Sequence, residues 1–259
     1  MLTSEQIAHF NAFGFLVLRE VLTRREVETI HRETDEIFDE ARSGRPYVGE
    51  KEPIQPFFER RPFMAKLVAD DRIYSIREDI LGPEFFLDLT EGWRHTGTTT
   101  WHSGGTYAED LPSIKIAFYI GFLTKETGCL RVIPGSHIRR SPDLLKSLRE
   151  ECDDPDFKPF GLPQSEVPYF ALDSEPSDLC VFTERILHAS FEGKPGRYQH
   201  ALTYVQTPVT EKEGAKVRDF YERTRYSYRA CKSSVNSPNP RIRRLVAPLV
   251  EIGFETHDI

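Results

Sequence analysis

The most constraining feature of this 259-residue chain is a series of short strand-like segments that begins at Phe85. Each segment is rich in β-branched and aromatic residues and is bounded by Gly, Pro or Asp, as β-strands joined by turns are. In chain order they read FFLDL, GTTTWH, SIKIAFYIGFL, CLRVIP, DLCVFT and HALTYVQ. One face of each strand has to be buried against another layer, so this series predicts a β-sandwich or barrel.

The residues before Phe85 have the pattern of helices. A first helix is predicted to start at Thr3 or Ser4 as N-cap and to end at Gly14, before a short strand FLVL. Further helices are expected in REVLTRREVETIHRETDEIFDEAR and MAKLVADDRIYSIREDIL, with a Pro- and Gly-rich loop between them. A short inserted helix is predicted in SPDLLKSLREEC. The pattern therefore indicates helices packed outside a β-core.

Composition excludes several classes of protein. Hydrophobic residues make up 39% and aromatic residues 12%, which is typical of a globular chain rather than a disordered one. No apolar run approaches the roughly 20 residues of a membrane helix, and the polar start MLTSEQIAHF lacks the pattern of a signal peptide. The net charge of −7 argues against general nucleic-acid binding. Four cysteines without CxxC spacing indicate reduced thiols and a cytoplasmic protein.

The segment 216–244 is basic, in contrast to the rest of the chain. It mixes aromatic residues with arginines, including Arg241, Arg243 and Arg244. One interpretation is a solvated surface. The other is a binding site for the phosphate or carboxylate of a small substrate, because guanidinium groups bind such anions in a bidentate manner.

Two of the eight histidines stand out by their position at strand ends. His102 follows the strand-like GTTTW, and His188 follows DLCVFTERIL. Imidazoles on facing strands of one barrel can bind a transition metal, although a lone histidine is more often a surface or core residue.

Four stretches together resemble the phytanoyl-CoA dioxygenase family of iron(II)- and 2-oxoglutarate-dependent enzymes. They are the helix-strand-helix opening LTSEQIAHFNAFGFLVLREVLTRREVETI and the motifs WHSG, GCLRVIPGSH and DLCVFTERILHAS. The resemblance extends from Leu2 to about Gln206 and implies that His102 and His188 bind iron. We also expect Trp101 and Phe118 to wall the pocket, although core packing is the favoured interpretation for Phe118.

The resemblance further implies a mainly β fold with flanking helices, a double-stranded β-helix (jelly roll, cupin-like). We expect a single domain over 1–259, with an N-terminal helical part at 1–84, core strands at 85–210 and a basic C-terminal segment at 211–259.

Gly104 departs from the family pattern, which has a carboxylate two residues after the first histidine. Residues i and i+2 of a strand face the same side, so position 104 is expected beside the metal next to His102. Glycine supplies no ligand, and a chloride ion there would preserve the charge at iron, as in the radical halogenases that carry Gly or Ala at this place. Glu109 or Asp110 could replace the missing ligand if the chain reverses. A tight turn at Gly104 and Gly105 is the ordinary alternative.

The family holds the distal carboxylate of 2-oxoglutarate with an arginine after the second histidine. Arg197 is the candidate in HASFEGKPGRYQHALTYV, although alignment of HAL with the family motif puts Gln199 at that place. Lys194 and a surface role for Arg197 remain open. Ser190 matches a family serine and is expected either to bond the same carboxylate or to be an ordinary strand-end hydroxyl.

The resemblance leads us to expect a halogenase that uses Fe(II), 2-oxoglutarate, O₂ and chloride to chlorinate an unactivated C–H bond. A hydroxylase of the same family and a non-catalytic metabolite-binding protein are the alternatives. The substrate is expected to be a freestanding anionic small molecule, such as a nucleoside monophosphate, with an amino acid or alkaloid as the rival. The candidate substrate-binding residues are Tyr107, Arg241, Arg243 and Arg244. Nothing in the sequence predicts the oligomeric state.

Overall fold

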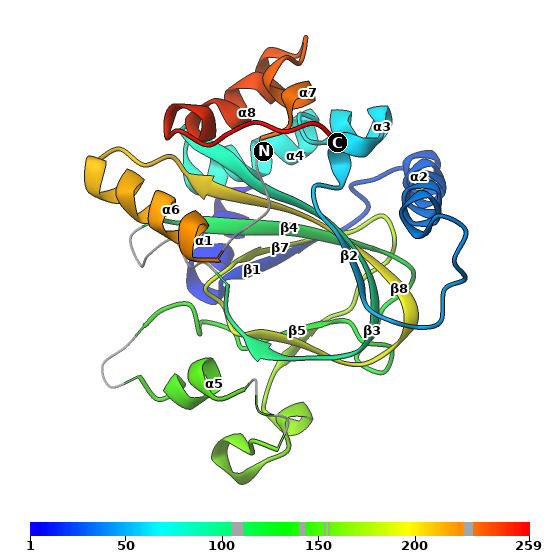
Figure 1. The fold of residues 1–259 in the computed structure, drawn as a ribbon. Helices are drawn as coiled ribbons and strands as arrows, with labels where there is room; N and C mark the ends of the chain where they lie inside the picture. The colour runs from blue at the N-terminus through cyan, green and yellow to red at the C-terminus, as the bar shows by residue number, and fades with distance from the viewer. Residues whose placement is uncertain (105–110, 140–142, 153, 155, 225–229) are drawn as a thin grey trace.

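The chain folds around one antiparallel β-sheet that curls into a barrel-like core (Figure 1). The computed structural model describes residues 1–104, 111–139, 143–152, 154, 156–224 and 230–259. Along the main path the strand order is β1-β7-β4-β8-β3-β2, while β5 pairs with β6 and β8. The predicted fold class, a mainly β jelly roll with flanking helices, is confirmed. The strands are β1 (Phe15–Leu18), β2 (Glu52–Ile54), β3 (Phe85–His102), β4 (Ser113–Ile120), β5 (Leu130–Val132), β6 (Phe170–Leu172), β7 (Leu179–Thr183) and β8 (His188–Gln206).

Two long strands, β3 and β8, form the wall that carries the candidate site. They pair antiparallel from Phe85 opposite Gln206 to His102 opposite His188. The register shifts at irregularities along the ladder, the last between Thr99 and His102. Such β-bulges bend and twist a sheet, which lets this ribbon curl around the core. Two strands that the sequence predicts separately, FFLDL and GTTTWH, are thus the two ends of β3.

Strand β4 shows how the two faces of the sheet differ. Alternate residues of a strand face opposite sides. Ile114, Ile116 and Phe118 pack with the helices outside the barrel, in a core that includes α2 (Arg24–Arg42) and α4 (Asp71–Leu81). On the opposite face of the strand, Lys115 and Tyr119 face the inside of the barrel. The outer face therefore forms the main hydrophobic core, and the inner face is free to carry polar groups.

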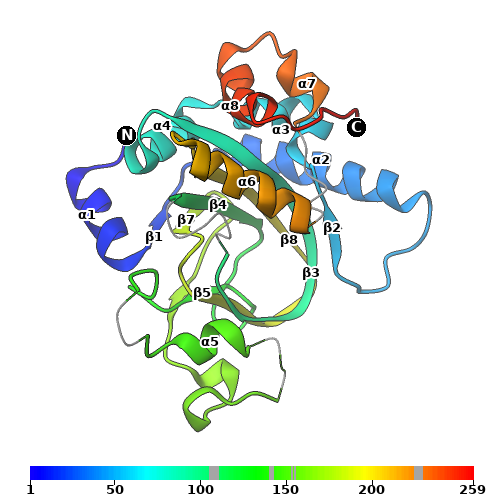
Figure 2. The same ribbon diagram turned by 60° about the vertical axis from the view of Figure 1, so that its left-hand side comes forward.

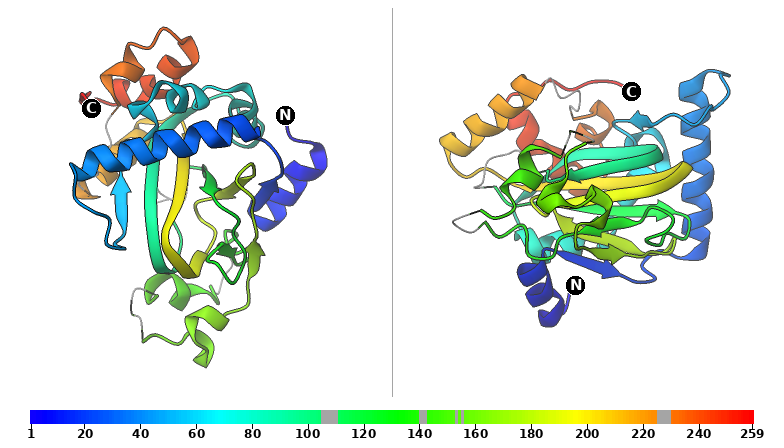
Figure 3. Two further views of the ribbon diagram at one scale, coloured as in Figure 1. Left: turned by 90° about the vertical axis from the view of Figure 1, so that its right-hand side faces the viewer. Right: turned by 90° about the horizontal axis from the view of Figure 1, so that it is seen from below.

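Helices cover the outside of the sheet on several sides. Helix α2 crosses the outer face of the barrel (Figure 3). Figure 2 shows α6 alongside the sheet and α5 on the far side of the barrel from α8. The remaining helices are α1 (Ser4–Phe13), α3 (Pro62–Leu67), α5 (Lys146–Glu150), α6 (Glu211–Thr224), α7 (Lys232–Val235) and α8 (Pro240–Glu251). No helix within the described ranges is both long and apolar enough to cross a bilayer.

The helix boundaries confirm some predictions and correct others. Thr3 is the N-cap of α1 in a capping box with Gln6, and Gly14 ends the helix at φ +85°. The helix predicted for 64–81 is two helices, because the Asp70 side chain caps a new start by accepting from the backbone N–H of Arg72. The loop predicted after α2 contains the short strand β2, and α5 is shorter than its predicted segment.

Two glycine-to-alanine substitutions should change stability in opposite directions. A Cβ at Gly92 in β3 would overlap the fully buried ring of Phe57, so Gly92→Ala should lower the free energy of unfolding by about 1–3 kcal/mol. Gly214 lies in α6 with open space around it apart from Arg218, so Gly214→Ala should raise it by about 0.5–1 kcal/mol. Urea unfolding followed by circular dichroism measures the free energy of unfolding of both variants. A Gly92→Ala variant as stable as the wild type would contradict the close contact between Gly92 and Phe57.

Candidate active site

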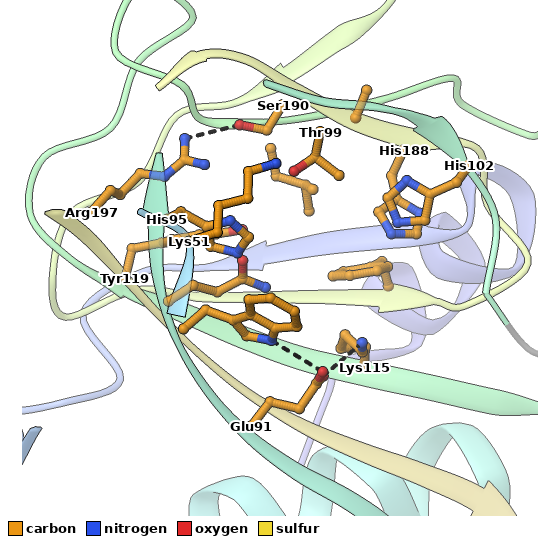
Figure 4. A pocket seen from close by; sticks show the side chains of 15 residues that line it. Lys51, Glu91, His95, Thr99, His102, Lys115, Tyr119, His188, Ser190 and Arg197 are labelled. Atoms are coloured by element: carbon orange, nitrogen blue, oxygen red, sulfur yellow. Dashed lines mark hydrogen bonds and ion pairs between the residues drawn. The ribbon is translucent and has the colours of Figure 1, made fainter. Parts of the chain in front are cut away.

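A cavity of about 380 Å³ lies inside the barrel, between β3, β4 and β8 (Figure 4). This volume is at the lower end of the range of small-molecule sites, about 300–1,000 Å³. The described residues that line it are Lys51, Glu91, Trp93, His95, Thr99, His102, Lys115, Tyr119, Leu130, Phe182, His188, Ala189, Ser190, Arg197 and Gln199.

The structure brings the two predicted metal ligands together at one side of this cavity. His102 ends β3, His188 begins β8, and the two are directly paired. Their ring centroids are 4.1 Å apart. The Nδ1 atom of each ring is hydrogen-bonded to a backbone carbonyl, that of Thr100 at 2.8 Å and that of Ile186 at 2.9 Å. In each neutral ring, Nδ1–H donates this bond, so Nε2 keeps the lone pair that binds a metal.

His188 is held in the neutral form that metal binding requires. Burial, and then the neighbouring His102, place its pKa well below the ordinary value of histidine. A charged imidazolium would be costly at such a site because the low-dielectric interior disfavours charge. The ring is therefore neutral near pH 7 and does not need to lose a proton to bind a cation.

Arg197 lies across the same cavity from the histidine pair (Figure 4). Its guanidinium is buried, and its Nη1 donates to the backbone carbonyl of Gly128 and, at 2.9 Å, to Oγ of Ser190. Ser190 donates its own hydroxyl hydrogen to Gly128. Among its described neighbours Arg197 has no carboxylate partner, and its Nε has no hydrogen-bond partner. A buried cation without a counter-ion is a site for an anion.

The alternatives to Arg197 lie differently. Gln199 also lines the cavity, two residues further along the same strand face, whereas Lys194 is exposed and does not line it. The structure thus places Arg197 and Ser190 together where an anion would bind.

Gly104 lies beside an acidic side chain that the sequence did not single out. A Cβ added to Gly104 would be 3.1 Å from Oε1 of Glu184 and 3.3 Å from its Cβ. Burial raises the pKa of the Glu184 carboxyl, and the nearby Lys115 opposes this shift. The space in which we expected a chloride ion therefore borders a carboxylate from the turn before His188.

Lys115 links Glu91, which lines the cavity, to Glu184, which does not. Its Nζ is 2.8 Å from Oε2 of Glu91 and 3.9 Å from Oε1 of Glu184. Oε1 of Glu91 also accepts hydrogen bonds from Gln55 and from the indole of Trp93. Burial alone would lower the pKa of Lys115, but the two carboxylates outweigh it and raise that pKa. Sequence alternation could have placed Lys115 inside the barrel, since it lies between apolar residues in SIKIAFYI.

The predicted substrate arginines do not lie at this cavity. Arg241 pairs with Asp71, Arg244 with Glu84, and Arg243 donates to the carbonyl of Ser237. All three are on α8, outside the barrel (Figure 1). The expectation that they bind the substrate in this pocket is corrected, because they bond to α4 and to neighbouring loops instead.

Some other predicted residues lie elsewhere. Trp101 is buried among Leu148 and Phe191 and donates to the carbonyl of Gln164, so it supports the strand end rather than lining the pocket. Tyr107, Glu109 and Asp110 lie outside the described residues.

A family comparison agrees with this arrangement. The sequence profile of the family described as phytanoyl-CoA dioxygenase (PhyH) matches residues 10–197, more than half of the chain. The chain belongs to this family. It is therefore an oxidoreductase of the Fe(II)- and 2-oxoglutarate-dependent dioxygenase kind.

Curated relatives and solved structures extend the comparison. Ectoine dioxygenases of Sphingopyxis alaskensis and Nocardia farcinica are 23% and 26% identical, over 73% and 74% of this chain and 70% and 67% of theirs. HygX from Streptomyces hygroscopicus, solved with nickel and 2-oxoglutarate, has a TM-score of 0.62 at 22% identity and covers 81% of this chain and 89% of its own. The carbocyclase SnoK from nogalamycin biosynthesis has a TM-score of 0.63 at 18% identity, covering 80% and 85%. At these identities the solved structures show a shared fold.

The residues present fit the cofactors of this family. Two imidazoles that are oriented through Nδ1 suit ligation of Fe(II) through Nε2, and the buried Arg197 with Ser190 suits the distal carboxylate of 2-oxoglutarate. As the side chains stand, no third His, Cys, Asp or Glu of the described residues completes a metal-binding group with the two histidines.

Removal of either histidine should abolish metal binding. His102→Ala and His188→Ala each remove one of two imidazoles that face each other, so Co(II) or Fe(II) binding should fall from about one ion per chain to none by calorimetry. His31→Ala, a half-exposed residue on α2, serves as control and should bind metal as the wild type does. Metal binding by either site variant at wild-type affinity would refute the assignment.

Arg197→Ala should weaken 2-oxoglutarate binding selectively. Loss of one partner of a buried ionic contact costs about 2–5 kcal/mol, so the dissociation constant for 2-oxoglutarate should rise about thirtyfold or more. Anaerobic calorimetry on the metal-loaded protein measures this, with the exposed Lys194→Ala as a matched control. Equal affinities for wild type and Arg197→Ala would show that another cation holds the cosubstrate.

Proposed function

We propose that the chain hydroxylates a C–H bond of a small anionic molecule in an Fe(II)- and 2-oxoglutarate-dependent reaction. The observation that carries this proposal is that one cavity contains both the His102–His188 pair and the buried Arg197, which pairs with no carboxylate of the described residues. Such a cavity suits a reaction in which a metal and an anionic cosubstrate act on a third molecule. Family membership favours an enzyme over the alternative of a metabolite-binding protein.

Bound iron and 2-oxoglutarate would supply the oxidising chemistry, in which O₂ converts 2-oxoglutarate to succinate and CO₂ and the second oxygen atom enters the substrate. The side chains of the protein position the cosubstrate and the metal-binding imidazole rings. Arg197 and Ser190 fix one end of the cosubstrate, which directs its other end toward the histidines. The backbone carbonyls of Thr100 and Ile186 hold the imidazole rings in a single orientation.

The polar lining of the remaining space supports a compact anionic substrate. Lys51 extends from the rim of the cavity, where its Nζ donates to the carbonyl of Thr98 at 2.6 Å, and it has no acidic partner within the described residues. Burial and the nearby Arg197 and Lys51 lower the pKa of His95 to about 4, so this ring is neutral near pH 7. Lys51 is therefore our candidate for the substrate anion, in place of the arginines of α8.

The rings of Trp93 and His95 stack at 5.1 Å between centroids and offer a flat surface for a planar group. A nucleoside monophosphate combines such a group with an anion and remains a candidate substrate. An amino acid or an alkaloid scaffold is the rival.

Chlorination of the same C–H bond is the second candidate function. Gly104 favours it, because this position carries no carboxylate of its own. Chloride would then be an additional cofactor.

The mass of the product distinguishes the two reactions. Purified protein with Fe(II), ascorbate, 2-oxoglutarate and O₂ should form succinate when pools of nucleoside monophosphates, amino acids or alkaloids are added in chloride-containing buffer. Hydroxylation adds one oxygen to the product, whereas chlorination gives the isotope doublet of chlorine. Failure of the anaerobic protein to develop the visible band of an Fe(II)–2-oxoglutarate complex would reject both reactions.

A further inference from the structure

Gly104 and Glu184 lie side by side although they come from different parts of the chain, and each is close in sequence to one of the two histidines. Gly104 lies two residues after His102, and Glu184 lies four residues before His188, in the turn after β7. The three atoms nearest to a Cβ placed on Gly104 all belong to Glu184, at 3.1, 3.3 and 3.5 Å. A side chain at position 104 would therefore meet Glu184 before any other group. Because glycine has no side chain, the Glu184 side chain can occupy the space next to position 104.

The backbone holds Glu184 at this place. Its N–H donates to the carbonyl of Ser113 at 3.3 Å, and the turn closes when the N–H of Ile186 donates to the carbonyl of Thr183 at 3.0 Å. Strand β7 before the turn pairs with β1 and β4, and β8 after it pairs with β3. The turn is therefore anchored on both sides, and the Glu184 side chain is buried rather than free to move into solvent.

The charge around Glu184 is incompletely balanced. Lys115 is its cation, but the ammonium lies closer to Glu91, at 2.8 Å, than to Glu184, at 3.9 Å. A buried carboxylate requires a counter-charge at short range. Among the described residues, one ammonium shared by two carboxylates leaves a deficit of one positive charge when both are ionised, which a divalent cation bound by the two histidines would offset.

We propose that Glu184 supplies the third protein ligand of the metal, in place of the carboxylate that residue 104 lacks. The proposal rests on the proposed function, because it assumes that His102 and His188 bind the metal. When metal binds, rotation of the Glu184 side chain moves its carboxylate from Lys115 to the metal, and Lys115 retains Glu91 as its partner. The site is then a two-histidine, one-carboxylate site whose acidic ligand comes from the turn before the second histidine.

This assignment has a direct consequence for the reaction. A carboxylate at the metal occupies the position and the charge that a halide ion would take. Wild-type protein should then bind 2-oxoglutarate and metal without any dependence on chloride, and oxygen rather than chlorine should be transferred.

Metal affinity and halide sensitivity test the proposal without measuring turnover. Co(II) is titrated into wild type, Glu184→Gln, Glu184→Ala and Glu28→Gln in sulfate buffer, and the visible bands are recorded before and after addition of sodium chloride or bromide. We expect Glu184→Gln to weaken Co(II) binding at least tenfold, and Glu28→Gln, which changes an exposed carboxylate on α2, to leave it unchanged within about threefold. Halide should leave the wild-type spectrum unchanged and should shift that of Glu184→Ala, in which the ligand position is open.

A second experiment moves the carboxylate from residue 184 to residue 104. Gly104→Asp alone should weaken Co(II) binding, because its Cβ would be 3.1 Å from Oε1 of Glu184 and two carboxylates would compete for one place. The double variant Gly104→Asp with Glu184→Ala should regain affinity within about tenfold of wild type. If a chloride ion occupied the space, Gly104→Asp alone should strengthen metal binding and abolish the halide effect.

The outcomes separate this inference from the proposed function. A halide-dependent spectrum of the wild type, with unchanged Co(II) affinity of Glu184→Gln, would overturn the role of Glu184 and leave the iron- and 2-oxoglutarate-dependent function intact. Absence of Co(II) binding by the wild type would reject both. Thermal denaturation of each apo-variant shows whether a loss of affinity reflects a loss of folding.

Discussion

The antiparallel pairing of β3 with β8 is the constraint on which the rest of the site depends. The ladder sets His102 opposite His188 and His95 opposite Arg197, so two strands carry both imidazoles and the candidate anion site. A slip of one residue in either strand would turn these side chains to the opposite face. The register is secured by burial of the outer face against the helices, where Leu202 and Tyr204 contribute to the main core.

The inside of the barrel brings several charged side chains to one cavity. Arg197 is buried without a carboxylate partner among the described residues, while Lys115 is shared between Glu91 and Glu184. Groups of this kind destabilise a folded protein unless a ligand completes them, and their orientation is fixed before the ligand arrives. Hydrophobic packing on the outer face of the sheet supplies the folding free energy that offsets the cost of burying these charges. The fold therefore holds ready a site whose charges suit a metal and an anionic cosubstrate.

The two histidines of β8 show that the face of the sheet on which a residue lies decides its role. His188 faces the cavity. His200 points to the helical side, where it bonds Thr34 of α2 and stacks on Phe118 at 5.0 Å. Burial lowers the pKa of His200 to about 3, so it is a neutral core residue. Its position in the sequence did not distinguish these two environments.

The sequence predicted helix ends and strands correctly where short-range features, such as a capping residue, determine them. Capping residues gave the start and end of α1, and each of the strand-like segments overlaps a strand of the sheet. The motifs around His102, His188 and Ser190 gave residues that the structure gathers in one cavity. The split between α3 and α4 was missed, because apolar spacing continues across Asp70 and hides the cap.

The sequence by itself determined the strand series, the two histidines and the absence of a carboxylate at Gly104, because each of these depends on residue type and short-range spacing. Tertiary structure alone decided which charges meet. It placed Arg241, Arg243 and Arg244 on α8 against other elements, and it brought Glu184 beside Gly104. The contact between Glu184 and position 104 joins segments that are far apart in the chain, and they meet only because β3, β7 and β8 belong to one curled sheet.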